Sequence, residues 1–209
     1  MASRWFPDWS AIKQTEHDDS VRADDDELDE SPETDYVLSR RVAEALTGRE
    51  WTVAAAESLT GGRVTSDLSA VEGASDWFLG GLVAYAEEVK FRLLGVNPGP
   101  VITAETALQM AVGATKLLGA DVAVATTGVG GPGPQEGKPQ GTVYIAVCTP
   151  EARSVSEYHL SGDPPDVVAG TSRRALRDLA AVIDSAVPTT SGKVPSTPVE
   201  IRSDDKHDG

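Results

Sequence analysis

The sequence has few of the residues on which several protein classes depend. Its single cysteine, Cys148, excludes an intramolecular disulfide, and with only three scattered histidines it predicts no zinc site. No apolar run approaches the ~18–20 residues that span a bilayer, and the N-terminus lacks the features of a signal peptide. We therefore expect a cytoplasmic protein without a membrane partner.

Basic residues are also scarce, with 18 lysines and arginines against 33 acidic residues and a net charge of −15. Such a chain lacks the basic face that phosphate backbones demand, which argues against a nucleic-acid partner. Much of the charge lies in residues 1–36, which hold 12 acidic and 3 basic side chains. The stretch 16–35 has almost no apolar residues, so we expect it to be disordered.

Composition divides the 209 residues into three segments. Residues 1–35 form an acidic leader, and residues 36–187 carry alternating apolar patterns of the size expected for one domain. Residues 188–209 are rich in Pro, Thr, Ser and Asp and are predicted to be a disordered tail. Hydrophobic residues make up 40% of the chain, which is ample for the core of one domain.

The middle segment alternates helical and strand patterns. Amphipathic spacing and capping residues predict helices at 36–47, 64–71, 87–94, 103–118 and 166–186, with Gly48 ending the first and Thr103 capping the fourth. Apolar runs predict strands at 51–56, 78–85, 122–126, 142–149 and 155–160, the last two as candidate neighbours. The alternation predicts a three-layer α/β/α fold with helices on both faces of one sheet.

Two glycine-rich turns, residues 57–62 and 127–132, follow predicted strands. Ligands of such sheets bind beyond the carboxyl ends of the strands, and glycine amides beside a helix start can hold a phosphate or an oxyanion. Two plainer explanations stand beside this one. Ser58 or Thr60 could be the N-cap of the following helix, and the second turn could be only a turn.

The sequence predicts no cofactor. A Walker A match that ends at Lys138 fails because Pro139 stands where a serine or threonine must bind magnesium. No GxGxxG motif follows a strand, so a dinucleotide site has no support either.

A tyrosine and a lysine follow the second predicted strand. Tyr85 ends this strand and Lys90 lies in the next helix, which places both near the sheet edge that carries Ser58. A serine becomes a good nucleophile when a base takes its proton. A lysine can be that base only when its pKa falls from about 10.4 to about 7–8. The alternative is a solvated lysine paired with Glu87, three residues before it.

The stretch Ala56-Glu57-Ser58-Leu59-Thr60-Gly61-Gly62 resembles the AESxTGG signature of the CinA C-terminal domain family, whose characterised members are nicotinamide-nucleotide amidases. The resemblance extends over residues 40–186. Further matching pieces, in chain order, are Gly73-Ala74-Ser75, Val83-Ala84-Tyr85, Lys90, Leu94-Gly95-Val96, Thr127-Gly128, Gly131-Pro132, Lys138-Pro139 and Gly141-Thr142-Val143-Tyr144.

The resemblance implies that the chain deamidates nicotinamide mononucleotide to nicotinate mononucleotide and ammonia, without a metal or a cofactor. Ser58 matches the nucleophile of the family, and Tyr85 and Lys90 match the residues that activate it. The resemblance also implies a stand-alone domain that forms a homo-oligomer, with a small nucleotide as its substrate. The residues then expected to bind this substrate are Glu57, Thr60, Gly61, Gly62, Thr127, Gly128 and Lys138.

Two departures from the family pattern bear on this function. The family usually has asparagine where Glu87 stands, and a carboxylate paired with Lys90 raises the lysine pKa. Pro164 stands where the family usually has an arginine, and Arg173 and Arg174 either substitute for it or form a surface pair. Two alternatives therefore stay open: a non-catalytic, regulatory nucleotide-binding protein, and an amidase for another small carboxamide.

Overall fold

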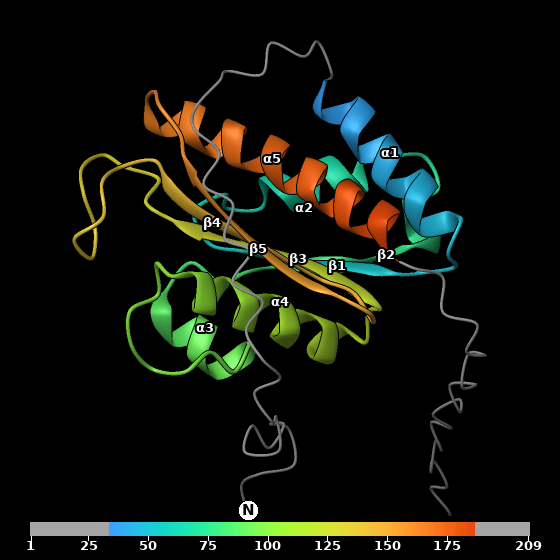
Figure 1. Ribbon diagram of the computed structural model, residues 1–209, viewed down its shortest axis with the longest axis horizontal. Coiled ribbons are helices and arrows are strands. Elements are labelled where there is room, and N and C mark those ends of the chain that lie inside the picture. The colour runs from blue at the N-terminus through green and yellow to red at the C-terminus, as the bar shows by residue number, and fades with distance from the viewer. Residues whose placement is uncertain (1–33, 187–209) are drawn as a thin grey trace, which may run out of the picture.

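The computed structural model describes residues 34–186 (Figure 1), so the disorder predicted for the tail, residues 188–209, and for all but the last two residues of the leader lies outside this part of the chain. The boundary of the predicted leader needs a correction. Thr34 caps the first helix, where its hydroxyl accepts a hydrogen bond from the Val37 N–H, and Asp35 is the first helical residue. The folded part therefore begins before residue 36.

The secondary structure follows the predicted alternation closely. The helices are α1 (Asp35–Thr47), α2 (Arg63–Ser69), the short 3-10 helix η2 (Ala74–Asp76), α3 (Glu87–Leu93), α4 (Ala104–Leu118) and α5 (Pro164–Ser185). The strands are β1 (Val53–Glu57), β2 (Phe78–Val83), β3 (Val122–Gly128), β4 (Thr142–Cys148) and β5 (Arg153–His159). The clearest difference is β2, which ends two residues before Tyr85.

The five strands form one sheet in the order β2-β1-β3-β4-β5. β1 lies between β2 and β3 and runs parallel to both, and helices make these parallel connections. β4 runs antiparallel to both β3 and β5, which confirms that the two predicted strands after residue 141 are neighbours. The sheet is therefore mixed, and the carboxyl ends of β1, β2 and β3 meet at one edge.

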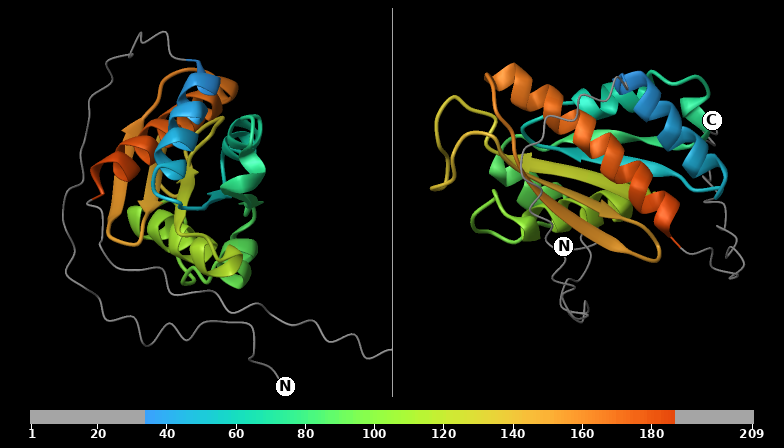
Figure 2. Two further views of the ribbon diagram at one scale, coloured as in Figure 1. Left: turned by 90° about the vertical axis from the view of Figure 1, so that its right-hand side faces the viewer. Right: turned by 45° about the horizontal axis from the view of Figure 1, so that its top comes forward.

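Helices cover both faces of the sheet, as predicted. Figure 2 shows α1, α2 and α5 on one side and α3 and α4 on the other. Because successive side chains of a strand point to opposite faces, β1 divides between two cores. Val53 and Ala55 pack with α1, α2 and α5, whereas Ala54 and Ala56 pack with α3 and α4. Every residue of β1, β3 and β4 is buried, as expected for strands that are covered on both faces.

Helix ends follow the capping rules at α4 and differ in detail at α1. The Thr103 hydroxyl accepts a hydrogen bond from the Thr106 N–H at 3.0 Å, which confirms the predicted cap of α4. Gly48 is itself the C-cap of α1, with a right-handed φ of −61°, rather than the residue after it. No helix among residues 34–186 combines the length and the apolarity that a membrane span needs.

Candidate active site

The predicted site residues gather where three parallel strands end. Beyond the last residue of β1, the Ser58 N–H donates to the Thr126 carbonyl of β3 at 3.0 Å. On the other side, the Ala84 N–H donates to the Glu57 carbonyl at 2.7 Å, just before Tyr85. These bonds continue the ladder one step past the strands. The backbone therefore holds Ser58 between the end of β3 and the chain that leads to Lys90.

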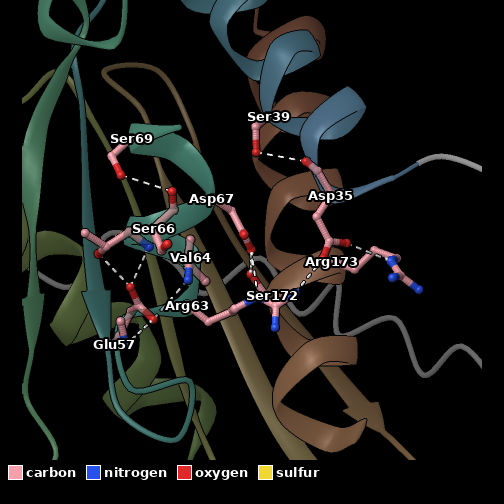
Figure 3. A network of polar contacts seen from close by, with 12 residues as sticks. Asp35, Ser39, Glu57, Arg63, Val64, Ser66, Asp67, Ser69, Ser172 and Arg173 are labelled. Atoms are coloured by element: carbon pink, nitrogen blue, oxygen red, sulfur yellow. Dashed lines mark hydrogen bonds and ion pairs between the residues drawn. The ribbon is translucent and has the colours of Figure 1, made fainter. Parts of the chain in front are cut away.

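Glu57 is buried directly before Ser58, with 1% of its surface exposed. Its side chain points to the α2 face, as alternation from Val53 and Ala55 requires, and it caps the start of this helix (Figure 3). Oε2 accepts from the N–H groups of Gly62 and Val64 at 2.9 and 3.2 Å. Oε1 accepts from the N–H and the hydroxyl of Thr65 at 2.7 and 2.6 Å.

This capping corrects three expectations about the first glycine-rich turn. The Glu57 carboxylate is fully engaged with α2, so its role is structural rather than substrate binding. The Gly62 N–H donates to that carboxylate and the Gly61 N–H donates to the Ser58 carbonyl at 3.1 Å, so neither amide can hold an oxyanion or a phosphate. Neither Ser58 nor Thr60 caps the helix. A whole turn separates Glu57 from α2 in the sequence, so no local pattern indicated that Glu57 caps this helix.

Two threonines that were expected to bind substrate are buried and have protein partners. The Thr60 hydroxyl lies 2.8 Å from that of Thr126, which ties the turn after β1 to β3. The Thr127 hydroxyl donates to the Val101 carbonyl at 2.8 Å. A Cβ on Gly128 would stand 2.5 Å from the Thr142 carbonyl oxygen, so glycine is required there for close packing. These residues therefore shape the site through contacts within the protein, and their contact with a substrate stays a prediction.

Lys90 is buried, with only 1% of its surface exposed, and this overturns the alternative of a solvated helix lysine. Its amine donates to the backbone carbonyl of Tyr85 at 2.9 Å, and no ion pair joins it to Glu87 among residues 34–186. Burial lowers the pKa of Lys90, because the charged form loses its hydration. The carboxylates of Glu87 and Glu136 oppose this and raise the pKa.

The other two predicted catalytic side chains are more accessible. Tyr85 is 71% exposed and lies outside β2, while Ser58 is half-buried. In the part of the chain that the structure describes, no hydrogen bond joins the Lys90 amine to the Ser58 hydroxyl or to the Tyr85 phenol. The backbone thus brings the three residues to one edge of the sheet, and their chemical roles stay predictions.

Lys138 lies at the same edge, in the loop between β3 and β4. Its amine donates to the Tyr144 hydroxyl at 2.8 Å, and this bond raises the pKa of the lysine. Tyr144 stands opposite Thr127 in the register of β3 and β4. Lys138 is therefore a partly exposed cation beside the end of β3, and its role in substrate binding stays a prediction.

Sequence reasoning missed Glu136, which lies two residues before Lys138. Its carboxylate accepts hydrogen bonds from the backbone N–H groups of Val101 and Ile102, and its φ of 49° is left-handed. An isolated acidic residue before Gly137 in a loop of glycines and prolines was the available signal. That signal says nothing about a partner 34 residues away.

The two arginines that were candidates to replace the missing family arginine have other partners. Arg173 pairs with Asp35 at 3.0 Å, and Asp35 also accepts from Arg63 at 2.9 Å, which links α1, α2 and α5 (Figure 3). The Arg174 guanidinium lies 4.7 Å from the centre of the Tyr158 ring. Both arginines therefore stabilise the helical face opposite Lys90, which favours the surface-pair interpretation.

The segment around Pro164, where the sequence departs from the family pattern, forms the start of α5. Asp163 is the N-cap and Pro164 the first helical residue, where its missing N–H is harmless. The Asp163 N–H donates to the Asp166 carboxylate at 3.1 Å. The sequence at this position thus favours a stable helix start and supplies no cation.

The described residues contain no group of three or more His, Cys, Asp or Glu side chains that could hold a metal ion. Cys148 is buried in β4, and burial raises the pKa of its thiol. A thiol with a raised pKa stays protonated and is a poor nucleophile. We therefore assign neither a metal site nor a reactive thiol to this part of the chain.

Comparison with known proteins agrees with this architecture. The family model described as the CinA C-terminal domain matches residues 35–183. Among curated relatives, a CinA-like protein of Frankia casuarinae is 41% identical over 159 residues, which is 72% of this chain and 37% of the relative. A CinA-like protein of Geobacter sulfurreducens is 38% identical over 156 residues, which is 72% of this chain and 36% of the relative. The chain thus spans about a third of the length of these relatives.

Two crystal structures of similar proteins have the same fold. A CinA superfamily protein of Klebsiella pneumoniae has a TM-score of 0.70 and 30% identity, over 73% of this chain and 99% of that chain. A competence/damage inducible protein of Agrobacterium tumefaciens has a TM-score of 0.69 and 31% identity, over 74% and 98% respectively. The match covers nearly all of each solved chain.

Proposed function

This chain belongs to the CinA C-terminal domain family, and on that premise we propose that it is an amidohydrolase that deamidates nicotinamide mononucleotide. The products are nicotinate mononucleotide and ammonia. The proposal takes its substrate from the resemblance of residues 56–62 to the signature of the family's nicotinamide-nucleotide amidases. It takes its mechanism from Ser58, Tyr85 and Lys90 at the carboxyl edge of the sheet.

The burial of Lys90 is the observation that carries the proposal. A fully buried ammonium is costly because it loses its hydration, so burial lowers the pKa of Lys90 and favours the neutral amine. A neutral amine has a lone pair that can accept a proton, as a general base requires. Its hydrogen bond to the Tyr85 carbonyl directs one N–H away and leaves the lone pair for another partner. A buried lysine with one acceptor is typical of a functional group rather than of a structural one.

In the proposed reaction, Ser58 Oγ attacks the carboxamide carbon while its proton passes to the Lys90 amine. The tetrahedral intermediate collapses when the C–N bond breaks, and the leaving nitrogen takes that proton and departs as ammonia. Water then attacks the acyl-serine ester while the Lys90 amine accepts a proton from it. The ester C–O bond breaks, and the Ser58 oxygen takes this proton back from Lys90. In this proposal the exposed Tyr85 phenol relays protons during these steps.

Replacement of Ser58 tests the proposal. We expect Ser58→Ala to lower kcat for ammonia release from nicotinamide mononucleotide by at least about a thousandfold, because it removes the nucleophile. Ser66→Ala is the matched control, since Ser66 is an exposed serine of α2 whose hydroxyl has no part in the site. Full activity in Ser58→Ala would exclude a serine mechanism.

A second candidate function is nucleotide binding without turnover. It is favoured by Glu87, whose carboxylate raises the pKa of Lys90 and so favours the protonated form, which cannot act as a base. Calorimetric titration with nicotinamide mononucleotide, run beside the ammonia assay, separates the two functions. Binding without ammonia would support the regulatory protein.

A third candidate is hydrolysis of another small carboxamide. It is favoured by the start of α5, where Pro164 replaces the family arginine, and by the partners of Arg173 and Arg174. These features leave fewer cations for a phosphate. A panel of nicotinamide mononucleotide, its dephosphorylated riboside and free nicotinamide tests this candidate, which predicts the highest kcat/KM for a compound without phosphate.

A further inference from the structure

The loop between β3 and β4 contains a two-residue hairpin with an unusual residue at its tip. Gln135 and Lys138 exchange backbone hydrogen bonds of 3.0 and 2.8 Å, and the residues between them, Glu136 and Gly137, have φ values of 49° and 75°. Two positive φ values define the type I′ turn, for which Asn-Gly and Asp-Gly are the preferred pairs. A left-handed backbone is unfavourable for glutamate because its Cβ lies too close to the following carbonyl oxygen, and hydrogen bonds of its side chain can offset this cost.

The Glu136 carboxylate makes two hydrogen bonds that offset this cost. Oε1 accepts from the Val101 N–H at 3.0 Å and Oε2 from the Ile102 N–H at 2.9 Å. Val101 and Ile102 are buried just before Thr103, the cap of α4. Charged acceptors make stronger hydrogen bonds than neutral ones. Glu136 therefore fixes the tip of the loop to the segment that leads into α4.

The same segment and the same loop are also tied to the candidate active site. The Val101 carbonyl accepts a hydrogen bond from Thr127 at the end of β3. At the start of the loop, a Cβ built on Gly130 would lie 3.6 Å from the Cβ of Leu59, the neighbour of Ser58. The loop thus runs from the Ser58 turn to the start of α4, and Lys138 follows the second anchor, Glu136, by two residues.

Charge links the tip of this loop to the buried lysine. The carboxylates that act on the Lys90 ammonium are Glu87, from the same helix, and Glu136, from the loop. Both residues are exposed, but Glu87 anchors no loop among residues 34–186, whereas Glu136 also holds the loop tip to residues 101–102. Glu87 and Glu136 thus both raise the pKa of Lys90, but only Glu136, among the described residues, holds the loop to residues 101–102.

We propose that Glu136 is a positioning residue of the active site: its carboxylate clamps the loop between β3 and β4 onto residues 101–102 and thereby holds Lys138 beside the substrate. The proposal rests on the proposed function for its kinetic part. Its structural part, the clamp itself, stands on the geometry of the free protein. Release of the clamp frees the loop tip and weakens substrate binding without removal of the nucleophile or the base.

A series at position 136 separates the clamp from the turn. Glu136→Gln keeps the length of the side chain but offers one acceptor oxygen, and Glu136→Asn is too short to reach residues 101–102 while it suits a type I′ turn. If the clamp matters, loop order falls in the sequence Glu, Gln, Asn. If only the turn matters, the order reverses and Asn gives the most stable loop.

Amide hydrogen exchange of the free protein measures the clamp directly. We expect exchange of the Val101 and Ile102 amides to become at least about tenfold faster in Glu136→Asn, with a smaller change in Glu136→Gln. Glu87→Gln is the control, because it removes a carboxylate near Lys90 but no loop contact. Unchanged exchange in Glu136→Asn would overturn the proposal, whatever reaction the protein catalyses.

Kinetics with nicotinamide mononucleotide then tests the consequence. We expect Glu136→Asn to raise KM about tenfold with a smaller change in kcat, and Glu87→Gln to leave KM unchanged. Both variants shift the acid limb of the pH–rate profile to lower pH, since each removes a carboxylate that favours protonated Lys90. Equal KM values for Glu136→Asn and the unsubstituted protein would overturn the kinetic part. Absence of turnover in the unsubstituted protein would overturn the proposed function and leave the exchange result decisive for the clamp.

Discussion

Two charged side chains are fully buried at the ends of neighbouring parallel strands, and they differ sharply in their hydrogen bonds. Glu57, at the end of β1, accepts four hydrogen bonds from α2. Lys90, after β2, donates one hydrogen bond within residues 34–186, to the Tyr85 carbonyl. Both are 1% exposed. The surroundings of Glu57 satisfy its charge, whereas those of Lys90 leave the amine with unused hydrogen-bonding capacity.

This difference separates structure from chemistry. Burial of a charge is tolerated when hydrogen bonds replace its hydration, and the charged form then contributes to stability. Where they are too few, burial shifts the pKa toward the neutral form, which is the condition that a lysine base requires. We therefore expect removal of Glu57 to harm the fold and removal of Lys90 to harm the reaction.

Glu57→Ala should have the largest effect on stability. It leaves four donors of α2 and its preceding turn, which are buried or partly buried, without their acceptor, and we expect the free energy of unfolding to fall by about 3 kcal/mol. Urea unfolding at neutral pH measures this change. Glu72→Ala, at an exposed glutamate, is the control and should change stability by less than ~0.5 kcal/mol. A loss below ~1 kcal/mol for Glu57→Ala would contradict the structural role.

Lys90→Met should act in the opposite direction. The thioether fills a similar volume without a charge to bury, so we expect the free energy of unfolding to rise by about 1 kcal/mol. Ammonia release should fall by at least about a hundredfold, since the base is lost. Arg92→Met, at an exposed cation of the same helix, is the matched control for both measurements. A clear loss of stability in Lys90→Met would show that the lysine is structural, as Glu57 is.

The difference in unfolding free energy between Lys90→Met and the unsubstituted protein should depend on pH, and the direction of this dependence can be predicted. The folded-state pKa of Lys90 is lowered by burial, while the unfolded chain keeps an ordinary value of about 10.4. Between the two values the unfolded chain binds more protons, so the unfolding free energy of the unsubstituted protein rises with pH. The advantage of Lys90→Met should therefore be greatest below the folded-state pKa and shrink toward pH 10. A gap that widens with pH would exclude the lowered pKa.

Asp35→Asn should have the smallest effect. Asp35 accepts from Arg63 and Arg173 at the surface where α1, α2 and α5 meet, and both arginines are partly exposed. Such pairs contribute little, and we expect a loss of about 0.5–1 kcal/mol at low salt. In 1 M NaCl, where the Debye length is about 3 Å, the difference should nearly vanish. A larger loss that salt does not alter would contradict this prediction and show that the ion pairs of Asp35 contribute to stability on the scale expected for Glu57.

The sequence predicted most of the fold because its signals are local. Apolar periodicity located each α-helix and strand to within a few residues but not the short 3-10 helix η2, and Thr103 marked the start of α4 as expected. The pattern also brought the turns after β1 and β3 to one edge, since parallel strands end at the same side of a sheet. The end of β2 was placed too late because the apolar run continues through Ala84 and Tyr85, beyond the last paired residue.

The roles of the polar residues were harder to predict. Glu57 and Ser58 are adjacent in the sequence, yet strand alternation directs the Glu57 carboxylate to α2, where backbone N–H groups at the start of the helix donate hydrogen bonds to it. The Glu136 clamp depends on Val101 and Ile102, which lie 35 and 34 residues away, and no pattern within the loop predicts this contact. The state of Lys90 depends on how completely the folded chain buries its side chain.

Local sequence alone thus determined the alternation of elements, the helix caps and the family signature, because each depends on residues within a few positions of one another. Tertiary structure decided which buried charge is satisfied and which is not. The energy of a charge depends on every dipole and carboxylate that surrounds it in space, and only the folded chain brings α2 to Glu57 and the carboxylate of Glu136 near Lys90.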